Sequence, residues 1–174
     1  MLALNLHNIK GAKERFESVY PPTAIGAGSE DFAVVAPVEL AFDIYKDKDQ
    51  FRLVGTVKTT LEMPCSRCLE PFVAPIDTPF DLRYQPHAKI SAESEREVEE
   101  DDLTTAFYEN EEIDLSQLMH EQFYLALPMK PLCGDGCRGL CTTCGTNLNR
   151  TTCDCHPEWE DPRLAVLKAL KKES

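Results

Sequence analysis

Residues 38–63 read VELAFDIYKDKDQFRLVGTVKTTLEM, and this stretch decides the fold class. Apolar residues alternate with polar ones on both sides of the polar turn at 46–49, a period typical of strands with one buried face. A third alternating run covers residues 72–84. The sequence therefore predicts an antiparallel β-meander of three strands. The apolar positions that share a parity are Val34, Ala36, Val38, Leu40, Phe42 and Ile44, then Phe51, Leu53, Val57, Leu61 and Met63, then Phe72, Ala74, Ile76, Phe80, Leu82 and Tyr84.

Around this meander the pattern is less regular. A short strand is predicted over residues 2–6, whereas prolines and glycines leave no long element over 10–31. Prolines recur in the third run, which indicates an edge or irregular strand because proline donates no ladder hydrogen bond. A helix capped by Asp114 ends before Pro128, and a second begins at Asp161 and Pro162. The predicted class is α+β, an antiparallel, open barrel-like sheet packed with a few helices, plus a cysteine-rich C-terminal segment.

The chain has 174 residues and a formal net charge of −12. That charge argues against a protein that coats nucleic acid non-specifically. No stretch approaches the roughly 18 apolar residues of a membrane span. The first twenty residues lack the apolar region of a secretory signal, so we expect a cytoplasmic protein.

The negative charge is concentrated in one window. Residues 91–125 hold twelve acidic residues and a single basic one, Arg96. A segment that overlaps this window, about residues 86–112, is expected to form a flexible acidic loop. The acidic window at 91–125 is either a solvated linker between two structured parts, or a docking surface for a basic partner or a mimic of a phosphate backbone.

Eight cysteines in a reducing compartment favour metal ligands over disulfides. Cys141 and Cys144 form a C-x-x-C turn followed by Gly145, which directs two thiolates at one tetrahedral ion. The second pair is Cys153 with Cys155, or alternatively Cys133 with Cys137. Structural Zn²⁺ suits four thiolates, with an iron–sulfur cluster or redox thiols as alternatives. His156 is a weaker ligand candidate.

A separate C-x-x-C pair, Cys65 and Cys68, falls in the predicted hairpin between the second and third strands. It has three interpretations. The thiols pack as small apolar groups, they share a metal with the C-terminal cysteines, or they form a binding site that presents Arg67 to a phosphate or carboxylate.

These motifs together resemble the YceD family, the large ribosomal RNA subunit accumulation proteins. The resemblance spans roughly residues 30–172 and departs from the family pattern at Thr142, where a proline is usual. The matching segments, in order, are CSRCLEPF at 65–72, EIDL at 112–115, LP at 127–128, CRGLC at 137–141, CG at 144–145, NLN at 147–149, CDC at 153–155 and DPRL at 161–164.

The resemblance implies a non-enzymatic cytoplasmic factor for ribosome biogenesis, which supports accumulation of large-subunit ribosomal RNA by binding pre-ribosomal RNA or a ribosomal protein. Residues 1–128 would form the core domain, and residues 129–174 the metal-binding segment and C-terminal helix. The alternatives are a redox-sensing adaptor and a zinc-dependent RNA-processing enzyme, for which the sequence holds no H-E-x-x-H motif. Candidate contacts with a partner are Arg52, Lys58, Arg67, Arg83, Arg138 and Arg150.

Overall fold

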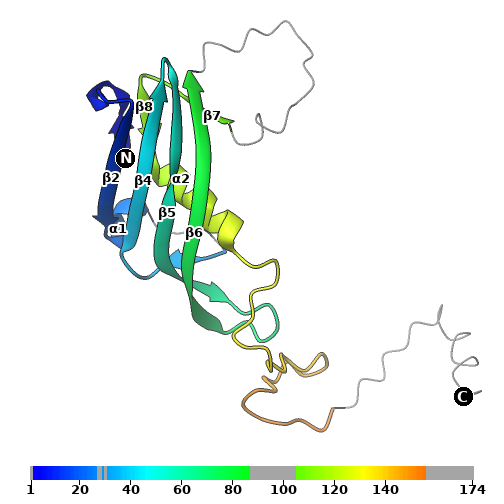
Figure 1. Ribbon diagram of the computed structural model, residues 1–174. Helices are drawn as coiled ribbons and strands as arrows, with labels where there is room; N and C mark the ends of the chain where they lie inside the picture. Colours follow the sequence, from blue (N-terminus) through cyan, green and yellow to red (C-terminus); the bar gives the residue numbers. More distant parts are fainter. Residues whose placement is uncertain (1, 27–28, 30, 87–104, 156–174) are drawn as a thin grey trace, which may run out of the picture.

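The computed structural model describes residues 2–26, 29, 31–86 and 105–155, and Figure 1 shows their arrangement. A long, twisted sheet forms one layer and a single longer helix lies across it. The strands are β1 (Ala3–Asn5), β2 (Lys13–Tyr20), β3 (Ala33–Val34), β4 (Val38–Asp47), β5 (Gln50–Pro64), β6 (Pro71–Pro86), β7 (Thr105–Tyr108) and β8 (Glu112–Asp114). The helices are α1 (Pro22–Ile25) and α2 (Leu115–Ala126), with a short 3₁₀ turn, η1 (Leu6–Asn8).

The predicted meander is confirmed as β4, β5 and β6, which pair antiparallel in that order. The sheet order is β2-β4-β5-β6-β7, β3 adds to β5, and β1 with β8 makes a separate two-stranded sheet. The α+β class is confirmed, but among the described residues the sheet remains open and does not close into a barrel. Its last pair, β6 with β7, is parallel, which differs from the all-antiparallel expectation.

Two further expectations are wrong. Residues 10–31 were expected to hold no long element, yet β2 pairs with β4 over eight residues. Only Phe16 and Tyr20 are apolar on its inner face, so its periodic signal is weak. The acidic loop predicted at 86–112 contains β7 and the start of β8. A four-residue strand beside so many acids carries too little local pattern to be recognised. Residues 87–104 and the predicted helix from Asp161 lie outside the described residues.

The core lies between the sheet and α2 (Figure 1). The alternating positions of β4, β5 and β6 point into it, and Leu40, Leu53 and Val57 are almost fully buried. The strand prolines also fit this geometry. The described part of β6 has a neighbour on its outer side only at Arg83–Pro86, so Pro71, Pro75 and Pro79 face an edge with no ladder to complete. Across the described residues, no helix is long and apolar enough to span a membrane.

Helix α2 begins where the sequence predicts. The Asp114 carboxylate accepts hydrogen bonds from the backbone N–H groups of Ser116 at 2.8 Å and Gln117 at 3.2 Å. The Gln117 side chain does not return to the cap; it donates to Glu121 at 2.9 Å instead. The apolar face of α2 buries Leu118, Met119 and Phe123.

We expect Asp114→Ala to lower the free energy of unfolding by about 1 kcal/mol, because two N–H groups at the start of α2 lose their acceptor. Urea unfolding followed by circular dichroism measures the change. Asp114→Asn is the control, since an asparagine side chain keeps a capping oxygen. Equal losses in both variants would contradict a capping role.

Candidate metal centres

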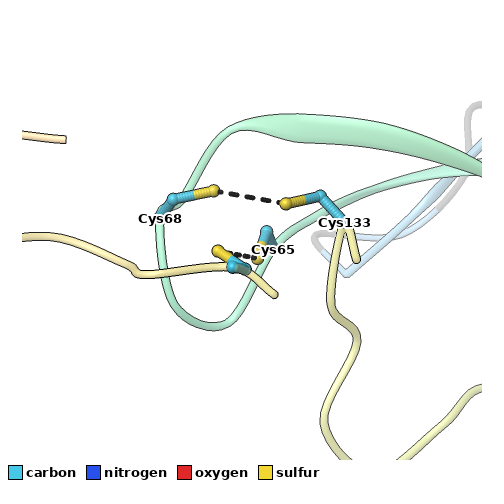
Figure 2. A group of neighbouring side chains, drawn as sticks. Cys65, Cys68 and Cys133 are labelled. Carbon is cyan, nitrogen blue, oxygen red and sulfur yellow. Dashed lines mark hydrogen bonds between the residues drawn. The ribbon is translucent and has the colours of Figure 1, made fainter. Parts of the chain in front are cut away.

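Two groups of four cysteines come together in the structure, each with its sulfur atoms within 4.8 Å of one another. The first, here called the hairpin cluster, comprises Cys65, Cys68, Cys133 and Cys137. Its Cys65–Cys137 and Cys68–Cys133 sulfur pairs are each 3.8 Å apart, and Figure 2 shows Cys68 pointing at Cys133. A tetrahedral ion with metal–sulfur bonds of about 2.3 Å separates its sulfurs by about 3.8 Å. The hairpin cluster therefore has the dimensions of a tetrathiolate site.

The turn between β5 and β6 supplies half of this cluster. The N–H of Leu69 donates to the Cys65 carbonyl at 2.9 Å, and the N–H of Cys65 donates to the Glu70 carbonyl at 2.9 Å. Leu69 has a φ of 59°, in the left-handed region that a side chain enters only at some cost. The Leu69 side chain is 65% exposed, whereas Cys65 and Cys68 are buried. The turn conformation therefore buries the two cysteine side chains and not that of Leu69.

The segment after α2 supplies the other half and is attached to the hairpin by hydrogen bonds. The N–H of Ser66 donates to the Pro131 carbonyl at 2.8 Å, and the N–H of Leu140 donates to the Arg67 carbonyl at 3.1 Å. The Arg67 guanidinium donates to the Cys137 carbonyl at 2.9 Å. Arg67 thus connects the two parts of the cluster. A Cβ on Gly139 would lie 3.0 Å from the Arg67 carbonyl oxygen, so this approach needs glycine.

The second group, here called the terminal cluster, comprises Cys141, Cys144, Cys153 and Cys155. Its C-x-x-C turn repeats the hairpin design: the N–H of Gly145 donates to the Cys141 carbonyl at 2.9 Å, and Gly145 has a φ of 73°. The terminal cluster is more exposed than the hairpin cluster, in which three of four cysteines are buried. An Asn149 side-chain N–H donates to the Cys137 sulfur at 3.3 Å and links the two groups.

The thiols within each cluster differ in acidity. The backbone N–H of Cys68 lowers the pKa of Cys65 to about 6. In contrast, the hydrogen bond between Cys133 and Cys137, followed by burial, raises the pKa of Cys133 to about 12. The Thr146 side chain lowers the pKa of Cys144 to about 6, and the neighbouring Cys144 raises that of Cys155 to about 12. Four thiolates this close repel one another, so full ionisation needs a cation among them.

The structure brings together the four ligands predicted from sequence, Cys141, Cys144, Cys153 and Cys155, and separates them from the alternates Cys133 and Cys137. Those alternates instead join Cys65 and Cys68, so the geometry favours the interpretation in which the hairpin pair shares a metal. One signal in the sequence pointed to this arrangement, since eight cysteines are twice four. His156 lies outside the described residues.

The candidate partner-contacting cations are mostly engaged within the protein. Arg52 pairs with Asp81 at 2.5 Å, Lys58 with Asp77 at 2.8 Å and Arg150 with Glu70 at 2.5 Å. Arg83 also has an interaction partner. Exposed cations that are paired in this way attract phosphate weakly, because the neighbouring carboxylates cancel their field.

Comparison with known proteins adds an identification to this geometry. The family model described as "Large ribosomal RNA subunit accumulation protein YceD" matches residues 53–171, a range that includes both clusters. The chain belongs to the YceD family. It is 26% identical over 174 aligned residues to the Arabidopsis thaliana protein named "Large ribosomal RNA subunit accumulation protein YCED homolog 1, chloroplastic", covering 83% of this chain and 51% of the relative.

Two other relatives widen the YceD comparison. The Zea mays protein of the same name is 30% identical, covering 70% of this chain and 49% of the relative. An uncharacterized Mycobacterium tuberculosis protein is 28% identical, covering 88% of this chain and 72% of the relative. The chain therefore spans about half the length of the plant relatives. No solved structure matches it.

Proposed function

We propose that this YceD protein is a non-enzymatic factor for ribosome biogenesis that supports accumulation of large-subunit ribosomal RNA. The observation that carries the proposal is the family match across residues 53–171, together with the names of the two plant relatives. It acts by binding pre-ribosomal RNA or a ribosomal protein. Its compartment is reducing, such as the cytosol, which fits eight free cysteines.

Each cluster, in this proposal, binds one structural Zn²⁺. The sulfur separations of the hairpin cluster match a tetrahedral zinc site, and four soft thiolates suit zinc. The residues from Met129 to Cys155 contain no strand or helix of their own, so metal binding supplies the energy that orders them.

The non-enzymatic part of the proposal rests on ligand count. Four cysteines fill all the positions of a tetrahedral ion, whereas catalytic zinc keeps one position for water or substrate. The redox alternative has less support, because the Cys65 side chain that would be the reactive thiolate is completely buried.

A deletion strain tests the function directly. We expect the ratio of large-subunit to small-subunit ribosomal RNA to fall in cells that lack this protein, and to recover when the wild-type chain is restored. The tagged chain should sediment with large-subunit precursors in lysates. A normal ratio in the deletion strain, with the tagged chain absent from ribosomal fractions, would refute the proposed function.

A further inference from the structure

A cavity of about 580 Å³ lies between α2, β7, β8 and the end of β6. It is at the opposite end of the sheet from the cysteine clusters (Figure 1). Four carboxylates line it, those of Glu109, Glu112, Asp114 and Glu121, and its lining contains no lysine or arginine. Gln117 and several aromatic and aliphatic side chains form the rest of its wall. The cavity thus combines apolar wall residues with four negative charges.

The turn between β7 and β8 places two of these acidic residues opposite each other. Asn110 and Glu111 have φ values of 53° and 57°, the left-handed pair of a tight hairpin turn. The N–H of Glu112 donates to the Glu109 carbonyl at 3.0 Å, so Glu109 and Glu112 face each other across the turn. Neither forms an ion pair with any described residue. Like charges opposite one another destabilise a hairpin, and a bound cation would relieve that repulsion.

Tyr84 provides a second, independent feature of the cavity. The residue is only 6% exposed, and its hydroxyl has no hydrogen-bond partner among the described residues. Every fully enclosed polar side-chain atom of the described residues has a hydrogen-bond partner. Because the Tyr84 hydroxyl has none, it is not fully enclosed, and we infer that it opens onto the cavity that Tyr84 lines. Burial, followed by the Glu121 and Asp114 charges, raises the pKa of Tyr84 and keeps the phenol neutral. A neutral phenol oxygen can accept a hydrogen bond from a ligand.

These features select a particular kind of cation. A metal ion needs ligands close together, but within the described chain only cysteines form groups of three or more such ligands within 4.8 Å. The carboxylates here are spread around a cavity that is large enough for a side chain. A guanidinium offers several N–H donors to carboxylates and a flat face to aromatic rings, and its aliphatic stem suits apolar walls.

We propose that this cavity binds an arginine side chain of a basic protein partner. The inference deepens the proposed function, on which it rests for its biological setting, by naming protein and not RNA as the ligand of this site. A nucleic acid would bring phosphates against four carboxylates, which repel it. A basic protein segment brings the complementary charge.

Nuclear magnetic resonance titration of the zinc-loaded full chain tests the proposal. The probe is the peptide acetyl-Gly-Arg-Gly-amide, and the same peptide with citrulline in place of arginine is the uncharged control. We expect saturable shifts at Tyr84, Ala106 and Leu118 with the arginine peptide alone. Glu109→Gln/Glu112→Gln and Tyr84→Phe should each weaken binding about fivefold, by loss of charge and of a hydrogen-bond acceptor respectively.

A matched charge variant separates the cavity from the general acidity of the chain. Glu39→Gln/Glu62→Gln removes two exposed carboxylates from β4 and β5 and should change the affinity less than twofold. Equal weakening by both double variants, equal binding of the citrulline peptide, or shifts scattered over the surface would each overturn the proposal. This test uses purified protein, so its failure is distinguishable from a normal ribosomal RNA ratio in the deletion strain, which refutes the proposed function instead.

Discussion

Cys133→Ser is expected to release one of two bound zinc ions and to detach the cysteine-rich segment from the β5–β6 hairpin. Cys133 is the exposed member of the hairpin cluster, so its replacement removes a ligand with little direct loss of packing. The amides of Ser66 and Leu140 donate across the junction, at 2.8 and 3.1 Å. Hydrogen-exchange protection at both amides should fall by more than about 100-fold, because metal binding supplies the folding energy of such segments.

Cys144→Ser is the matched control, since Cys144 is the exposed member of the terminal cluster that has a backbone turn of its own. It should also leave one zinc ion per chain, but Ser66 and Leu140 should stay protected. Protection should be lost instead at Cys141, whose N–H donates to the Thr146 carbonyl at 2.8 Å. Loss of both ions in either variant, or two ions retained by Cys133→Ser, would contradict two independent sites.

Phe123→Ala is expected to lower the free energy of unfolding by about 3–5 kcal/mol. Phe123 is fully buried on the inner face of α2 and packs edge-on against Phe32, with ring centroids 6.0 Å apart. Its truncation leaves a cavity where α2 meets the sheet, and domains of this size are stable by only about 5–15 kcal/mol. Urea denaturation of the zinc-loaded chain measures the difference.

Leu125→Ala, on the same helix, provides the comparison for this experiment. Leu125 is 77% exposed, so we expect its truncation to change stability by no more than about 0.5 kcal/mol. Both substitutions replace a large apolar residue by alanine in the last turns of α2. Similar losses in the two variants would contradict the role of burial against the sheet, because alanine has the higher helix propensity and propensity alone predicts no loss.

Zinc binding, as proposed, would give each cysteine cluster a net negative charge. A Zn²⁺ ion with four thiolates carries two net negative charges, so cations nearby are stabilising. The hairpin cluster has Arg67 on the Cys137 carbonyl, and Arg150 pairs with Glu70 beside the same turn. Both arginines are among the candidate contacts with a partner that the sequence suggests. Their placement instead supports a structural role in holding the cysteine-rich segment against the hairpin.

Most of the fold could be predicted where the local pattern was strong. The alternation over β4, β5 and β6 extends through many residues, and Asp114 provides a recognisable start for α2. Strand β2 was missed because Glu14 and Ser18 occupy inner positions where apolar residues would mark a strand. Strand β7 was missed because its pairing with β6 is parallel and joins residues far apart in the sequence, which leaves no turn signal between them.

The cysteine sites likewise combine features set by residues close in the sequence with contacts between distant segments. The sequence by itself determined the meander, the capped helix and the pairing of Cys141 and Cys144, because each depends on residues that are neighbours along the chain. Only the tertiary structure decided that Cys65 and Cys68 meet Cys133 and Cys137, and that Tyr84 and four carboxylates surround one cavity. Such contacts depend on how β6, α2 and the segment after it pack together, and spacing along a chain carries no record of that packing.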